Sequence, residues 1–303
     1  EFLMKKNKEV IKIEYQENTI IKKYTNSDFP SLSDISLVFK GMAVKDRKNY
    51  IFTEKNDNKD IFLLGNCIDK YVITNQFYTD YDLLKIVGGT KSKEKHDIAP
   101  RVLIRRTGNY LCCSFIENPA LTESTLYSCS PINDEYNSLY LLAVLNAKFL
   151  TYIVRQNMIT NEQAFPQILM TDLQLLKIPN IPLPAQQPII EKADQMLSLN
   201  KHLQEVSSKF QRTLEREFSL EKLSKKIENW YELSYADFLN ELKKQKTELS
   251  LSQKVEWEDY FLAEQQKAIA LKNQINQTDK EIDQMVYELY GLTKEEIEIV
   301  EKT

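Results

Sequence analysis

Glycine and histidine are scarce in this sequence, and the patterns that enzymes depend on are missing. Only six glycines occur in 303 residues, and no glycine-rich loop follows a predicted strand, so the usual cradle for a nucleotide phosphate or S-adenosylmethionine is lacking. The two histidines, His96 and His202, lie far apart in the chain and leave a serine or cysteine nucleophile without an evident base. No Asn/Asp-Pro-Pro-aromatic motif is present to hold a target amine. We therefore predict that this chain alone is not an enzyme.

Cysteine motifs and long apolar runs are also missing. The four cysteines show no CxxC spacing, which indicates a reduced protein without a metal framework and favours the bacterial cytoplasm. The most apolar window, Leu139–Val154, is interrupted by Asn146 and Lys148. It is also shorter than the roughly 20 residues that span a bilayer. We therefore expect a buried helix there and no membrane partner. Since the chain begins Glu1-Phe2-Leu3, we expect it to be a piece of a longer protein.

The charge is divided unevenly along the chain. Its net charge of −4 argues weakly against a nucleic-acid partner. However, residues 1–180 hold 23 Lys and Arg against 21 Asp and Glu, whereas residues 181–303 hold 17 against 23. Any contact with DNA is therefore expected in the first part, with the acidic second part as a scaffold.

Residues 1–178 are predicted to form one strand-rich domain. Short β-branched or aromatic runs at 11–15, 49–52, 61–64, 71–73 and 101–104 are separated by Asn, Asp and Gly clusters. Thr107-Gly108-Asn109 is typical of a hairpin turn between residues 102–106 and 110–115. A buried helix is expected over Tyr140–Gln156. Together these elements predict an α+β fold with a curved mixed sheet.

The second part is predicted to be helical. Three prolines in the segment Ile178–Pro184 favour an extended strap at residues 179–188. Beyond it, residues 189–303 show helical spacing up to about Phe218 and again over roughly 253–290, where apolar residues follow a near-heptad spacing. These two helices predict an antiparallel, coiled-coil-like hairpin with a small helical insert at 219–250. A dimerisation or partner-docking arm, which would pair chains through the long helices, is the alternative.

Three segments resemble one known family. Tyr140–Leu150 is similar to a leucine-rich helix of the TaqI-like C-terminal specificity domain, and Ala164–Ile168 with Ile181–Gln187 is similar to its proline strap, which also occurs in type I specificity subunits. Residues 282–297 look like the end of type IIG restriction–modification proteins. In this last segment, Gly291 is expected to end a helix, and Thr293 to cap the next one in a capping box with Glu296.

The resemblance implies a function for the chain. It would be the sequence-specific, double-stranded-DNA recognition module of a type IIG restriction–modification enzyme. Adenine methylation and DNA cleavage would belong to methyltransferase and nuclease domains outside this chain. S-adenosylmethionine and Mg²⁺ are accordingly implied for the parent protein, and no cofactor is expected in this chain.

Three groups of cationic and amide side chains are the candidate DNA contacts, because cations neutralise phosphates and Arg, Lys, Asn and Gln read base edges. The richest is the stretch 91–106, with turns near residues 45–48 and 155–163 as the others. For each group the alternative is a solvated polar loop. The candidates are Lys45, Arg47, Lys48, Lys91, Lys93, Lys95, Arg101, Arg105, Arg106, Arg155, Asn157, Asn161 and Gln163.

Two other functions compete with this interpretation. The chain could be the specificity subunit of a type I system, or half of one; a second strand-rich unit is expected in a whole subunit, and this sequence has only one. From another class, it could be an oligomerisation or partner-docking scaffold without DNA contact. A scaffold would self-associate and ignore duplex DNA.

Overall fold

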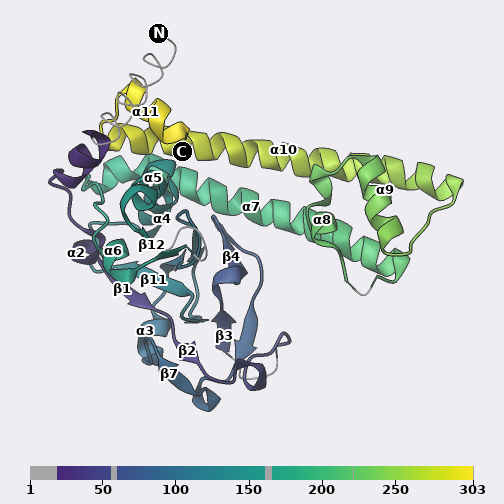
Figure 1. The fold of residues 1–303 in the computed structure, drawn as a ribbon, viewed down its shortest axis with the longest axis horizontal. Helices are drawn as coiled ribbons and strands as arrows, with labels where there is room; N and C mark the ends of the chain where they lie inside the picture. The colour runs from purple at the N-terminus through teal and green to yellow at the C-terminus, as the bar shows by residue number, and fades with distance from the viewer. Residues whose placement is uncertain (1–18, 56–59, 161–165, 221, 303) are drawn as a thin grey trace, which may run out of the picture. The chain divides into compact units, whose positions relative to one another are not determined.

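The computed structural model describes residues 19–55, 60–160, 166–220 and 222–302, and it divides the chain into two compact units. Unit 1 holds residues 1–194 and 280–303, and unit 2 holds residues 195–279. Small sheets and short helices make up most of unit 1, whereas the described part of unit 2 is helical (Figure 1). The α+β class expected from the sequence is confirmed, and the domain limits at residues 178 and 188 stay predictions.

Unit 1 is built on a four-stranded antiparallel sheet of order β1-β11-β8-β9. Its strands are β1 (Ser36–Lys40), β8 (Arg101–Arg105), β9 (Cys113–Ile116) and β11 (Leu126–Pro131). A mixed three-stranded sheet of order β10-β3-β6 pairs one parallel and one antiparallel neighbour. Its strands are β3 (Asp60–Leu63), β6 (Phe77–Thr79) and β10 (Leu121–Thr122).

Short strand pairs and helical turns complete the strand-rich part. The two-stranded pairs are β2 (Ala43–Val44) with β7 (Ile86–Gly88), β4 (Ile68–Asp69) with β5 (Val72–Ile73), and β12 (Ile159–Thr160) with β13 (Gln167–Ile168). The helical turns are α2 (Leu32–Ile35), η1 (Arg47–Asn49), η2 (Gly65–Cys67), η3 (Tyr81–Leu83), α3 (Lys93–Asp97) and α6 (Met170–Gln174).

The predicted hairpin is confirmed, and one predicted strand is wrong. β8 and β9 pair antiparallel, with Ile104 opposite Cys113, around a turn in which Gly108 has φ +126°. Asn49 instead ends η1, and of residues 49–52 only Phe52 forms an isolated β-bridge, with Tyr78. The predicted strand at 11–15 lies outside the described residues.

The buried helix expected over Tyr140–Gln156 is two helices, α4 (Ser138–Asn146) and α5 (Lys148–Asn157), bent by 59°. Ala147 between them is extended, with ψ 146°. The cause lies in Asn146, whose buried amide accepts a hydrogen bond from the Cys113 N–H (2.8 Å) and donates one to the Cys113 carbonyl (3.0 Å). These bonds fix the end of α4 against β9, so the apolar pattern alone did not give the break.

Proline placement explains where the first long helix begins. Residues 178–182 form neither helix nor strand, and α7 (Leu183–Phe218) starts inside the predicted strap. In its first turn the Ala185 N–H donates to the Pro182 carbonyl (2.8 Å). Pro184 is tolerated there because the N–H groups of a first turn lack helical partners. Gln186 is fully buried and donates to the carbonyls of Glu135 (2.7 Å) and Ile181 (3.0 Å).

Unit 2 contains the predicted helical insert and the adjoining parts of both long helices. The insert is formed by α8 (Lys225–Glu228), η4 (Trp230–Glu232) and α9 (Tyr235–Lys244), and the second long helix is α10 (Leu251–Leu289). Phe210 of α7 stacks on Trp230 of the insert, with ring centroids 3.7 Å apart, and on Tyr260 of α10 at 5.5 Å. This aromatic cluster is the core of unit 2.

The two long helices run antiparallel, as predicted (Figure 1). Within unit 2, Phe218 at the end of α7 lies against Trp257 near the start of α10, with centroids 4.9 Å apart. Within unit 1, Lys192 near the start of α7 pairs with Glu281 of α10 at 2.6 Å. Among the apolar residues at near-heptad spacing in α10, Phe261, Ala268, Ile275 and Ile282 are buried.

The C-terminal segment belongs to unit 1. Gly291 has φ +62°, and α11 (Lys294–Glu301) begins with the predicted capping box of Thr293 and Glu296. Asp283 of α10 is 2% exposed, and its carboxylate accepts a hydrogen bond from the Lys148 N–H at 2.8 Å. It thereby caps the first turn of α5 from another element, since that turn has no helical acceptor of its own.

No single helix among the described residues has both the length and the apolar composition of a membrane span, and the bent pair α4 and α5 passes that test only when counted together.

Candidate nucleic-acid interface

The β2–β7 pair brings two of the three predicted groups together. The Lys45 N–H donates to the Lys85 carbonyl (2.9 Å), which places η1 beside the start of the segment that leads into α3. Both strands lie at the same end of unit 1 (Figure 1). The side chains of six cations are exposed there: Lys45, Arg47, Lys48, Lys85, Lys91 and Lys95. Lys85 was not predicted, because it is the lone cation in the sequence Leu83–Thr90 and belongs to no basic run. We call these six residues the ribbon cations.

Arg47 is held by a buried carboxylate. Glu123 is 6% exposed and accepts hydrogen bonds from the N–H (2.8 Å) and hydroxyl (2.6 Å) of Thr125. The guanidinium of Arg47 lies 3.6 Å from the same carboxylate while half of its side chain stays exposed. Glu123 therefore orients the guanidinium of Arg47 from the buried side, and the exposed half of the side chain is available to contact an anion.

Acidic neighbours reduce the availability of one predicted cation. Lys93 lies 3.0 Å from Asp60 and 3.4 Å from Asp97. The hydrogen bond to Asp60 raises the pKa of Lys93 above its usual value. Its charge is thus already balanced by two carboxylates, so Lys93 adds less to an anion-binding surface than the exposed Lys91 and Lys95.

Arg101 is the clear correction to the predicted set. Its side chain is fully buried and donates to the Ser128 hydroxyl (3.2 Å) and the carbonyls of His96 (2.6 Å), Ile98 and Ala120. Burial lowers the pKa of Arg101 to about 10, so the group stays charged at neutral pH. In this arrangement Arg101 cannot touch DNA; it holds α3 against the four-stranded sheet.

His96 belongs to the same buried layer. Its Nδ1 accepts a hydrogen bond from the Thr122 N–H (3.3 Å), which leaves Nε2 to donate to the Thr90 carbonyl (3.0 Å). Burial lowers the pKa of His96 below its usual value. The ring is therefore neutral and structural rather than a phosphate ligand.

Arg105 and Arg106 are half-buried and point to different partners. Arg105 donates to the Tyr110 hydroxyl (2.6 Å), and Arg106 donates to the Gln167 side chain (2.7 Å). This fits the opposite faces expected of neighbouring strand residues. Both retain exposed area, so a direct role in DNA contact stays a prediction for each.

The third predicted group is described only in part. Arg155 is half-buried near the end of α5, and Asn157 is its last residue. Asn161 and Gln163 lie outside the described residues.

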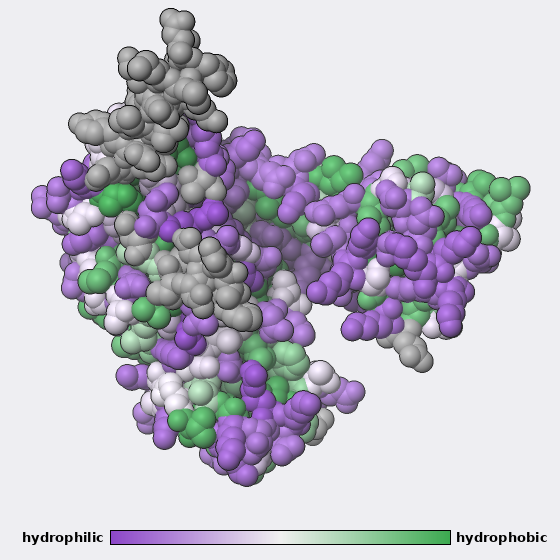
Figure 2. Space-filling view, in the orientation of Figure 1, coloured by the Kyte–Doolittle hydropathy of each residue, from purple (hydrophilic) through white to green (hydrophobic). Residues whose placement is uncertain are grey.

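A chain of contacts connects the ribbon cations to Arg106. The Arg106 N–H donates to the Thr125 carbonyl (2.9 Å), and Thr125 bonds to the carboxylate of Glu123 that faces Arg47. The turn at 123–125 thus lies between two predicted groups. A role of the three groups in DNA contact stays a prediction. Figure 2 shows hydrophilic residues mixed with hydrophobic ones over the end of unit 1 that carries β2 and β7.

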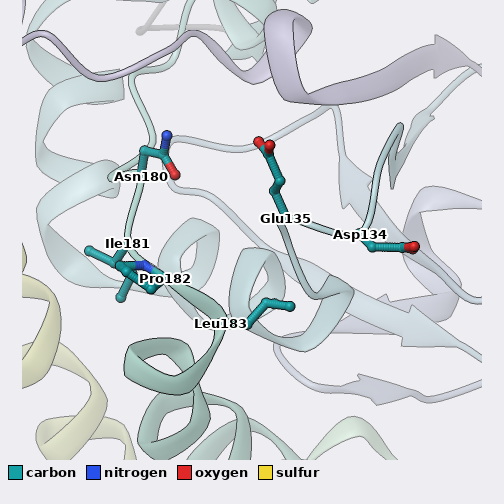
Figure 3. Close-up of a pocket in the computed structure, with 6 residues that line it drawn as sticks. All are labelled: Asp134, Glu135, Asn180, Ile181, Pro182 and Leu183. Carbon is teal, nitrogen blue, oxygen red and sulfur yellow. The ribbon is translucent and has the colours of Figure 1, made fainter.

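One cavity of unit 1 has the wrong charge for binding DNA. An open cavity of about 600 Å³ is lined by Asp134, Glu135, Asn180, Ile181, Pro182 and Leu183 (Figure 3). Both carboxylates are exposed, and Asp134 points away from the other five residues. No cation is among the lining residues, so a phosphate backbone would be repelled.

Two stretches of the chain match known families. Residues 60–179 match the TaqI-like C-terminal specificity domain, and residues 183–286 match a domain of unknown function, DUF8810. No curated protein matches the chain. The predicted resemblance to the TaqI-like specificity domain is confirmed for residues 60–179.

Several solved structures are similar over a larger part of the chain. The HsdS subunit from Thermoanaerobacter tengcongensis is 16% identical, with a TM-score of 0.38, and is matched over 75% of this chain and 52% of its own. A chain from a type I R-M system structure is 18% identical, with a TM-score of 0.41 and coverages of 71% and 53%. The type IIL enzyme MmeI, solved in complex with DNA, is 12% identical, with a TM-score of 0.47 and coverages of 90% and 35%. The chain spans about half of the first two and a third of MmeI.

Proposed function

We propose that this chain, which contains a TaqI-like C-terminal specificity domain at residues 60–179, recognises a particular sequence of double-stranded DNA for a restriction–modification protein. The observation that carries the proposal is the family match over the segment that holds β7 and α3. The β2–β7 pairing adds Lys45, Arg47 and Lys48 to the cations of that segment.

The ribbon cations supply the general part of binding. Each Lys or Arg that neutralises a phosphate releases counterions, so affinity falls steeply with salt. Sequence is then read by groups that reach base edges. Arg47 is suited to this second role, because Glu123 holds its guanidinium and a bidentate contact with guanine requires an oriented fork.

The remaining parts of the reaction would lie elsewhere in the parent protein. In the type IIG arrangement that we propose, methyltransferase and nuclease domains outside this chain would bind S-adenosylmethionine and Mg²⁺ and modify the DNA that this module selects, in the bacterial cytoplasm. The type I arrangement, in which this chain is a specificity subunit or half of one, is the alternative. Pairing of two chains through the long helices also stays a proposal.

Binding to random-sequence duplexes, followed by sequencing of the retained DNA, tests the function. We expect one recurring sequence and an affinity that falls with salt. The variant Lys45→Ala/Lys48→Ala/Lys91→Ala should bind more weakly on every sequence, and its slope of log affinity against log salt should fall by about 2–3 if each lysine meets one phosphate.

The matched control removes three exposed lysines from unit 2, Lys201→Ala/Lys209→Ala/Lys225→Ala, and so changes the net charge equally. It should keep the wild-type slope. Salt-independent or absent duplex binding by the wild-type chain, together with self-association in sedimentation, would instead support the scaffold.

A further inference from the structure

Val87 stands out among the ribbon cations because it is an exposed apolar residue on a β-bulge. Ala43 pairs with Gly88, and Val44 pairs with Ile86, so Val87 is the extra residue of β7. Its side chain is 65% exposed. Bulges of this kind redirect a side chain and are frequent beside functional sites.

The backbone around Val87 is anchored on both sides. Ile86 and Val44 pack against the buried cluster of Met42, Phe62 and Leu121. Of the three residues of β7, Val87 is the exposed one, whereas Ile86 and Gly88 are partly covered, so its side chain points away from the core.

Close contact of backbones fixes the other side. Gly89 has φ +71°, and a Cβ there would lie 2.0 Å from the Gly41 carbonyl oxygen. The same crossing brings Gly41 against Glu123, since a Cβ on Gly41 would lie 2.2 Å from the Glu123 carbonyl oxygen. Val87 is therefore presented by a rigid support rather than by a mobile loop, which is the arrangement that a reading contact needs.

The surroundings of Val87 identify the class of partner. Lys45 and Lys85 are joined by a backbone hydrogen bond next to the bulge, and Lys91 follows on the same segment. Residues 43–48 and 82–97 together hold seven Lys and Arg against four acidic residues, Asp46, Asp82, Glu94 and Asp97. The excess of positive charge favours a polyanion, and the major groove of DNA admits a two-stranded β-ribbon. The apolar group that this groove displays is the C5-methyl of thymine.

We propose that the β2–β7 ribbon enters the major groove and that Val87 is a specificity-determining residue that contacts a thymine methyl group. This inference rests on the proposed function and adds one residue and one chemical group to it. The lysines set the position of the ribbon on the phosphates, and Val87 distinguishes a base that carries the methyl from one that lacks it.

A thermodynamic cycle between protein and DNA tests this contact. The selected duplex is prepared with each dT replaced in turn by dU, which removes only the methyl group. Affinities are measured for the wild type and for Val87→Ser. At one position, dU should weaken wild-type binding roughly fourfold, the ratio that corresponds to about 0.8 kcal/mol for one buried methyl group. Val87→Ser should bind dT and dU equally at that position.

Ile132→Ser is the control. Ile132 is 59% exposed and follows β11. It lies at the end of β11 that pairs with Ser36, whereas β2 follows the other end of β1, at Lys40. This variant should keep the wild-type response to dU. Equal dU responses of wild type and Val87→Ser at every thymine overturn the role of Val87 while leaving the DNA function intact. A change in self-association without a change in DNA affinity overturns it in favour of a protein contact. Absence of duplex binding by the wild type overturns both proposals.

Discussion

At the scale of single residues, two polar side chains from the predicted basic stretch stabilise the fold and are buried away from the proposed interface. Arg101 and His96 form a buried layer that fastens α3 to the sheet. From the sequence, Arg101 belongs to a basic stretch and is indistinguishable from an exposed strand cation. Its burial depends on carbonyl groups of residues 96, 98 and 120, which only the folded chain brings together. By contrast, Lys45, Lys48, Lys91 and Lys95 lie in polar loops and the short helices η1 and α3, and their exposure agrees with the polar composition of these stretches.

Replacement of Arg101 tests its structural role. Arg101→Met leaves the carbonyls of His96, Ile98 and Ala120 and the buried Ser128 hydroxyl without their donor. The free energy of unfolding should therefore fall by roughly 3 kcal/mol or more. Urea denaturation measures the change. Lys91→Ala should leave the midpoint unaltered; an unaltered midpoint for Arg101→Met as well would contradict the assigned role.

Acidification tests His96. Because the pKa of His96 is lower in the folded chain than in the unfolded one, the unfolded state binds the proton first and stability falls as the pH drops below about 6.5. The stability contributed by the neutral ring is fully present above that pH. The wild type should therefore lose stability more steeply than His96→Gln between pH 7.5 and 5, by at most about 1.4 kcal/mol per pH unit. Parallel profiles of unfolding free energy against pH would rule this out.

At the scale of elements, the sequence predicted several features that depend on local pattern, although the strand expected at residues 49–52 was wrong. The β8–β9 hairpin, both long helices and the capping box of α11 follow from turn residues, apolar spacing and Thr293 with Glu296. The bend between α4 and α5 depends instead on a distant strand, because Asn146 bonds to Cys113. The β2–β7 pair was missed for a similar reason: strands of two and three residues are too short to show a periodicity, and their pairing joins distant segments.

Asn146 offers a direct test of the bend. Asn146→Leu removes both hydrogen bonds to Cys113 and leaves its buried N–H unpaired, whereas the Cys113 carbonyl keeps the bond from the Tyr71 N–H. We therefore expect a loss of about 1–3 kcal/mol of stability. Thermal or urea unfolding gives the value. Asn240→Leu, at an exposed position of α9, serves as the comparison; equal effects of the two changes would show that the bend does not depend on the amide.

At the scale of the whole molecule, unit 2 is an insertion into unit 1. The chain leaves unit 1 after Asp194 and returns at Lys280, and Lys192 pairs with Glu281 beside this junction. Both crossings lie within helices, so a short helix–helix turn can connect them. A chain that lacks residues 195–279 and carries such a turn should fold. Circular dichroism and a cooperative unfolding transition would establish this, whereas an aggregated or unfolded product would show that unit 1 needs unit 2.

The same shortened chain separates recognition from scaffolding. If the ribbon cations bind DNA as proposed, it should retain the salt-dependent duplex affinity of the whole chain within a fewfold. A loss of that affinity in a well-folded product would assign part of the contact to unit 2.

The crossing of Gly41, Gly89 and Glu123 sets a limit on how this protein can be re-engineered. No side chain fits at either glycine, so a library that alters target choice has to leave those two positions alone. Lys45, Lys48, Lys85 and Val87 are exposed and carry no such steric restriction, unlike Asp46 with its φ of +54° and Ile86, which packs on the core. Variation can therefore be concentrated on a few exposed positions, with the frame beneath them inherited unchanged from one variant to the next.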